Sequence, residues 1–231
     1  GAWDLGREAW RWTTRIDALP QPLNRASLHA GPAVAEETVA VLLLHEGAFT
    51  AAGFSLGEGR LLWTRQLHGG GTAFLRPPVP PLLAQGETLF IATGAGALAA
   101  LCARTGEPLW LHAYPRVEPG RETPSVLPPR ARASGTFGVE PRGFEASPMI
   151  LRGETLVLAP PDGDYLVGLH PGSGRLRWLS SPYDPGEEER KGPAVDVLVG
   201  ADGETLYLAG RRLMALEIST GRRLWEIALE S

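Results

Sequence analysis

Two residue types that often reveal a function are almost absent from the sequence. Cys102 is the only cysteine among 231 residues, which excludes internal disulfides and any cysteine-based zinc site. Lys191 is the only lysine, so arginine supplies nearly all of the 22 basic side chains. With 26 acidic residues the net charge is -4, and no basic surface indicates nucleic-acid binding.

Long hydrophobic runs are also missing. No apolar stretch approaches the ~20 residues that a membrane-spanning helix requires, so we expect no transmembrane segment. No signal-peptide pattern is visible. Apolar residues make up 43% and charged residues 21% of the chain, which favours a soluble globular protein. These features leave the cellular compartment open.

What the sequence does contain is an internal repeat that ends on tryptophan. Trp63, Trp110, Trp178 and Trp225 each follow a glycine by a few residues, and they are separated by 47, 68 and 47 residues. An earlier copy ends at Trp12. A period in the forties with one aromatic residue per unit is typical of a propeller or solenoid, because each unit leaves one face bare until a neighbour covers it.

Each unit carries three further marks in a fixed order. In the third unit they are Ser147-Pro148-Met149-Ile150, then Glu154-Thr155 with an apolar run, then Val167-Gly168-Leu169 before the tryptophan. Four short runs bounded by turn residues predict four strands per unit. The strand that starts at proline needs no ladder donor at its first position and is expected to be innermost. The tryptophan strand is expected to be outermost.

Four strands per unit at this period predict an all-β propeller of four-stranded antiparallel blades. An outer strand or hairpin over residues 2–16 would precede the first complete blade. The four complete blades are expected at approximately 31–67, 78–115, 146–182 and 192–229.

The run from Ala215 to Trp225, Ala-Leu-Glu-Ile-Ser-Thr-Gly-Arg-Arg-Leu-Trp, resembles the tryptophan-docking repeat of quinoprotein-type propellers, also called PQQ-like repeats. Residues 100–110 match that repeat as well, and residues 168–178 match it more loosely. The resemblance spans nearly the whole chain and implies a fold rather than an activity. The residues that carry the repeat are Trp12, Trp63, Trp110, Trp178, Trp225, Gly106, Gly174 and Gly221.

Propellers of this family have about eight blades, twice the number of complete units found in this sequence. Three explanations stay open: a piece of a longer protein whose remainder closes the ring, a compact four-bladed propeller with one extra strand, or two chains that pair in a homodimer. Exposed edge strands promote aggregation, so we expect closure or a partner.

Two connections between units are candidates for partner binding. Residues 116–145 form a long insertion rich in proline and arginine, and loops of this length in compact domains are usually functional or disordered. Residues 181–191 carry an acidic run that could equally be a solvated turn. Both connections join an outer strand to the next inner strand, so they should emerge on one face. Their candidate contact residues are Arg116, Arg121, Arg130, Arg132, Arg142, Glu187, Glu188 and Glu189.

Candidate catalytic chemistry is sparse. Asp162-Gly163-Asp164 is typical of a hairpin turn and lacks the spaced oxygen ligands of a calcium loop. The histidines share no ligand spacing, and the glycine-rich runs lack the strand-to-helix context of a phosphate loop. We therefore expect no catalytic, cofactor-binding or metal-binding residue.

The resemblance implies two classes of function. One is a quinone-dependent dehydrogenase, whose members need a catalytic aspartate, calcium-binding acids and commonly adjacent cysteines. The other is a non-catalytic module similar to the outer-membrane assembly lipoprotein or to the extracytoplasmic propeller of a sensor. Because the sequence offers no candidate residues for such a dehydrogenase site, we favour the second class. We therefore expect a cofactor-free scaffold that binds protein partners in the periplasm or outside the cell.

Overall fold

The computed structural model describes residues 1–69, 81–94, 96–114, 144, 147–163, 165–181 and 195–229. The candidate partner loops therefore lie outside the described residues, except for Phe144 and Ser181. The eight arginine and glutamate residues expected to contact partners are all among the residues left out.

Four antiparallel sheets of four strands follow one another along the chain, as the repeat predicted. A two-stranded hairpin precedes them, and two short 3-10 helices, η1 (Ile16–Ala18) and η2 (Leu23–Arg25), link it to the first sheet. The hairpin consists of β1 (Ala2–Asp4) and β2 (Ala9–Trp12). The first sheet consists of β3 (Ser27–Ala35), β4 (Thr38–His45), β5 (Ala48–Ser55) and β6 (Leu61–Gly69), and the second of β7 (Leu82–Gln85), β8 (Thr88–Ala92), β9 (Ala97–Cys102) and β10 (Pro108–Ala113). The third sheet consists of β11 (Ile150–Arg152), β12 (Thr155–Leu158), β13 (Leu166–Leu169) and β14 (Leu176–Ser180), and the fourth of β15 (Val195–Asp202), β16 (Thr205–Gly210), β17 (Arg212–Glu217) and β18 (Arg223–Ala228).

Every sheet is a simple meander, in which each strand pairs with the next one in the chain. The Glu-Thr mark of the repeat lies where the first strand turns into the second. In three sheets a glycine with positive φ opens this turn, for example Gly86 at +55° and Gly153 at +52°. Because glycine accepts positive φ without steric cost, these turns can be tight. The tryptophan strand then lies at one edge of its sheet and the first strand at the other.

The hydrophobic core lies between neighbouring sheets. Strands β12 and β13 are buried along their whole length because both faces of the third sheet are covered. The side chains that fill the three interfaces alternate along the strands. The first and second sheets meet at Leu42, Phe49, Leu89 and Leu101; the second and third at Phe90, Leu98, Leu156 and Leu158; the third and fourth at Val157, Leu166, Leu206 and Leu208.

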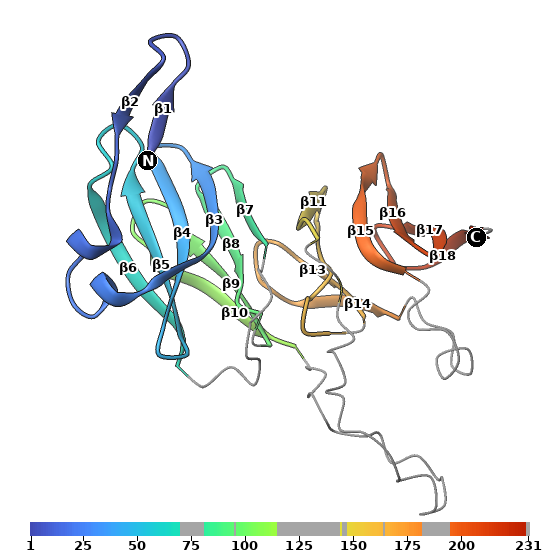
Figure 1. The fold of residues 1–231 in the computed structure, drawn as a ribbon. Helices are drawn as coiled ribbons and strands as arrows, with labels where there is room; N and C mark the ends of the chain where they lie inside the picture. Colours follow the sequence, from blue (N-terminus) through green and yellow to red (C-terminus); the bar gives the residue numbers. More distant parts are fainter. Residues whose placement is uncertain are drawn as a thin grey trace, which may run out of the picture.

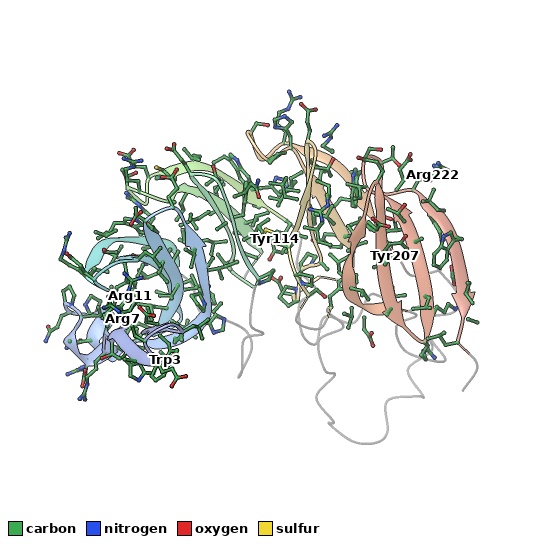
Figure 2. The ribbon with its side chains drawn as sticks, turned by 90° about the horizontal axis from the view of Figure 1, so that it is seen from above. Trp3, Arg7, Arg11, Tyr114, Tyr207 and Arg222 are labelled. Carbon is green, nitrogen blue, oxygen red and sulfur yellow. The ribbon has the colours of Figure 1, made fainter. Side chains whose placement is uncertain are left out.

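The sheets form an open row. Figure 1 places the N-terminal hairpin and the C-terminus at opposite ends, and Figure 2 shows the four sheets in chain order from one side to the other. No buried core cluster of the described residues joins the first sheet to the fourth. None of the helices in the described part of the chain is long and apolar enough to cross a membrane.

Candidate functional site

The sheets are joined to one another by tryptophan side chains. The indole N–H of Trp63, on the edge strand β6, donates a hydrogen bond of 2.8 Å to the carbonyl oxygen of Ala103 in the next sheet. Three other tryptophans repeat this contact with the element that follows them. Trp12 donates to Leu56 at 2.9 Å, Trp110 to Pro171 at 2.7 Å, and Trp178 to Ile218 at 2.9 Å.

A glycine lies under each docked ring. Gly59, Gly106, Gly174 and Gly221 have φ between +66° and +70°. A Cβ added at Gly174 or Gly221 would stand 2.5 Å from the tryptophan of the preceding element, and at Gly59 or Gly106 it would stand closer still. Glycine is therefore required at these positions for two reasons: the backbone has positive φ, and the tryptophan ring occupies the space of a Cβ.

Trp225 is much more exposed than Trp63 and Trp178, which occupy equivalent positions in the repeat. Its side chain is 42% exposed, whereas Trp63 is 9% and Trp178 is 8% exposed. The difference arises because the fourth sheet has no neighbour on that side among the described residues. Trp12, whose repeat copy has its glycine out of place, nevertheless docks as the others do.

A buried carboxylate joins the second sheet to the third. Asp162 lies in the connection between β12 and β13 and is only 1% exposed. Its Oδ2 accepts a hydrogen bond of 2.7 Å from the backbone N–H of Gly96, and its Oδ1 accepts one of 2.9 Å from the hydroxyl of Tyr114. Figure 2 shows Tyr114 between the two sheets. Sequence reasoning took Asp162 for an ordinary turn residue, because its partners lie 48 and 66 positions away.

Burial raises the pKa of the Tyr114 hydroxyl well above its ordinary value, and the neighbouring Asp162 charge raises it further. The phenol therefore stays protonated and keeps donating to the carboxylate. Tyr114 is also the last described residue before 115–143, and Phe144, which follows that segment, is 3% exposed within the core between the third and fourth sheets. Tyr114 and Phe144, the described residues that flank 115–143, are thus both buried.

Among the residues that the structure describes, the other titratable side chains show no catalytic grouping. Cys102, at the end of β9, is half-buried, and a hydrogen bond with the Thr105 side chain lowers the pKa of its thiol. Partial burial lowers the pKa of His112. Within the described ranges, no three His, Cys, Asp or Glu side chains lie close enough together to hold a metal ion.

Both oxygens of the Asp162 carboxylate accept hydrogen bonds from the protein, so its burial is explained by contacts within the chain. The chain also has one cysteine, where the resemblance to quinone-dependent dehydrogenases implies an adjacent pair. The contacts of the described residues therefore explain how the sheets are held together.

Four-stranded meander sheets fastened by tryptophan and glycine define a β-propeller of the quinoprotein repeat class. Residues 2–125 match the sequence profile of the family described as outer membrane protein assembly factor BamB. This match covers more than half of the chain, so the chain belongs to that family. The predicted family resemblance and propeller-type fold are confirmed.

Solved propellers share the fold. BamB from Moraxella catarrhalis matches with a TM-score of 0.57 and 16% identity, over 88% of this chain and 54% of that one. A europium-containing methanol dehydrogenase gives 0.61 and 13% over 88% and 43%, and quinohemoprotein alcohol dehydrogenase from Comamonas testosteroni gives 0.55 and 14% over 87% and 35%. The chain spans about half or less of these proteins, and the low identities support the fold alone. No curated protein sequence matches the chain.

Proposed function

We propose that this chain is a non-catalytic scaffold module that binds protein partners in an extracytoplasmic bacterial assembly. Membership of the family described as an outer membrane assembly factor is the observation that carries this proposal. A scaffold of this kind needs a rigid body and variable loops at one face. The docked tryptophans provide the rigid body, and the buried residues Tyr114 and Phe144 flank residues 115–143 of the long insertion.

The chemistry of the described residues supports a scaffold better than a quinone-dependent dehydrogenase. Asp162, the one buried carboxylate in the described part of the chain, accepts hydrogen bonds from Gly96 and Tyr114. Its role is structural, and removing it would weaken the contact between sheets. Opposite charges in the two candidate loops favour an oriented protein contact, since complementary charge steers encounter and fixes register.

The partner-binding proposal is tested by reversing charge in the long insertion. An Arg130→Glu and Arg132→Glu double variant is expected to recover less of the native partner in a pull-down from cell envelopes. The matched control is Arg7→Glu with Arg11→Glu, two exposed arginines at the distant hairpin, labelled in Figure 2. Equal recovery with both double variants would remove the insertion from the interface.

The enzymatic alternative has a separate test. Purified protein mixed with pyrroloquinoline quinone and calcium is expected to show no alcohol-dependent dye reduction above a protein-free control. Calcium-dependent reduction that is lost in Asp162→Asn would overturn the non-catalytic reading. Because Asp162→Asn also weakens the contact between sheets, its circular dichroism spectrum and melting temperature must be compared with those of the native chain.

A further inference from the structure

Strand β10 forms one edge of the second sheet (Figure 1), and among the described residues no strand pairs with its outer side. The backbone N–H of Tyr114, which directly follows β10, donates to the carbonyl oxygen of Gly96. Hydrogen-bonded and non-hydrogen-bonded pairs alternate along an antiparallel ladder, so the residues one and three positions before Tyr114 direct their N–H and C=O groups away from β9. These residues are Ala113 and Leu111.

The outer side of β10 also carries exposed apolar side chains. Leu111 is 61% exposed, and Leu109, two positions earlier, is 55% exposed. They alternate with Trp110, whose ring docks on the third sheet, so they lie on the opposite side of the strand. The strand therefore combines unpaired backbone groups with apolar surface that remains in contact with water.

The sequence of β10 contains no Asp, Glu, Lys or Arg, unlike the tryptophan strands of the other three sheets. Those strands carry Arg65 in β6, Arg177 in β14, and Arg223 and Glu226 in β18. Charged side chains on an edge strand oppose its pairing with other chains. Partial burial lowers the pKa of His112 in β10, which keeps its imidazole uncharged at neutral pH. Among these four strands, β10 is the one with least protection against pairing.

We propose that the outer edge of β10 binds an extended segment of a partner protein, which adds a fifth strand to the second sheet. The backbone of such a segment hydrogen-bonds with the outward groups of Leu111 and Ala113. Its side chains facing Leu109 and Leu111 are apolar and alternate along the segment, because a charge there would lose water without gaining a partner of opposite charge.

A second copy of this chain fits the same edge less well. Strand β10 has six residues, whereas a stable interface between folded proteins uses about 20–30 residues on each side. Pairing of β10 with its own copy therefore supplies too little contact for a stable dimer. An extended segment is bound through main-chain hydrogen bonds and alternate side chains, so a short edge is sufficient.

This edge goes beyond the partner binding proposed above, because it includes none of the arginine or glutamate residues of the two candidate loops. The two proposals can therefore fail separately. Unchanged partner recovery after charge reversal in the long insertion would leave the β10 edge in place. Failure of the binding tests below, which use purified protein and a synthetic peptide, would leave the scaffold function in place.

The first experiment measures peptide binding by fluorescence anisotropy. The probe is a fluorescein-labelled peptide of alternating threonine and leucine with a lysine at each end. Leu111→Lys should weaken binding by about tenfold or more, because the bound peptide would remove the new charge from water. Leu179→Lys is the matched control, since Leu179 is a 50% exposed leucine on β14, and it should bind as the native chain does. Absence of binding by the native chain, or equal affinities of the two variants, would overturn the proposal.

The second experiment locates the contact by amide hydrogen exchange, measured residue by residue with nuclear magnetic resonance. Saturating peptide should slow the exchange of the Leu111 and Ala113 amides by about tenfold or more, whereas the His112 amide, which already faces Leu98, should change little. Slowing at other strands without these two amides would contradict the proposed edge. Sedimentation velocity of the native chain alone should show no dimer. A dimer that Leu111→Lys dissolves would assign the edge to a second copy and overturn the proposal.

Discussion

At the scale of single residues, the docking glycines show how the lack of one side-chain atom permits packing between sheets. Gly106 has φ +69°, and the ring of Trp63 occupies the space where its Cβ would be. Gly86 has a similar φ of +55° but nothing within 4 Å of its Cβ position. Substituting alanine at each of the two glycines therefore distinguishes the free-energy cost of backbone strain from the cost of displacing a tryptophan ring.

We expect Gly106→Ala to destabilise the protein more than Gly86→Ala. Both substitutions put a Cβ on a left-handed backbone, which costs about 1 to 2 kcal/mol. Gly106→Ala also forces the Trp63 ring out of its seat, and such overpacking adds about 1 to 3 kcal/mol. Urea denaturation of the two variants measures the difference. Equal free energies of unfolding would contradict the docking role of Gly106.

Tyr114→Phe should destabilise the protein by about 1 to 3 kcal/mol at neutral pH, because it removes a donor from a buried carboxylate. The folded-state pKa of Tyr114 is raised, so the contribution of its hydroxyl is fully present below the ordinary tyrosine pKa of about 10 and is lost as pH rises above it. The gap in unfolding free energy between native protein and Tyr114→Phe should therefore be constant from pH 7 to about pH 9 and shrink above pH 10. A gap that widens with pH would contradict this assignment.

At the scale of elements, the position of a tryptophan in the row decides its energetic weight. Trp63 and Trp225 occur at equivalent places in their strands, ten residues after the small residue that pairs with each. Trp63 is covered by the next sheet, whereas Trp225 is 42% exposed. Their equivalence in sequence thus hides a difference in surroundings.

Trp63→Ala is expected to cost about 3 to 5 kcal/mol, as for other buried large aromatic residues. Trp225→Ala should cost on the order of 1 kcal/mol, because part of its surface remains in water. Chemical denaturation of both variants, followed by far-ultraviolet circular dichroism, provides the comparison. Similar losses for both would indicate that the side chain of Trp225 is already covered in solution.

The repeat predicted the strands and sheets well because its turn residues and tryptophans act locally. A proline, a Glu-Thr turn and a glycine each fix backbone conformation within a few residues, so strand order could be predicted from the sequence. Asp162 could not be recognised in the same way. Its role depends on Gly96 and Tyr114, which approach it only after two sheets have packed. The exposure of Trp225 likewise depends on what stands beside the fourth sheet.

At the scale of the whole molecule, the row of sheets has two unlike ends. The hairpin end exposes Trp3 and Trp10 beside Glu8, which has φ +49°, whereas the other end exposes Leu213, Trp225 and Ile227. Glu8 follows Ala2, the partner of Trp12, by six residues, which is the place of the docking glycine in the sheets, as Gly106 follows Ala100. The hairpin therefore lacks the glycine on which the tryptophans within the row dock. The open arrangement in Figure 1 is therefore consistent with these residues as well as with the topology.

The long insertion should contribute little to the stability of the whole protein while contributing to partner binding. Replacing residues 118–140 by a short glycine-serine linker leaves the anchors Tyr114 and Phe144 in place. A shorter loop lowers the entropy cost of closure by at most about 1 kcal/mol. The melting temperature should therefore stay the same or rise by up to about 3 °C.

The control for this deletion is Phe144→Ala in the full-length loop. It should lower the melting temperature, because it empties a buried site beside Trp178 and Val157. Pull-down of native partners should behave in the opposite way, with binding weakened by the deletion more than by Phe144→Ala. A deletion that lowers the melting temperature as much as Phe144→Ala would show that residues 118–140 pack against the sheets, and their proline and arginine content would then need a structural explanation.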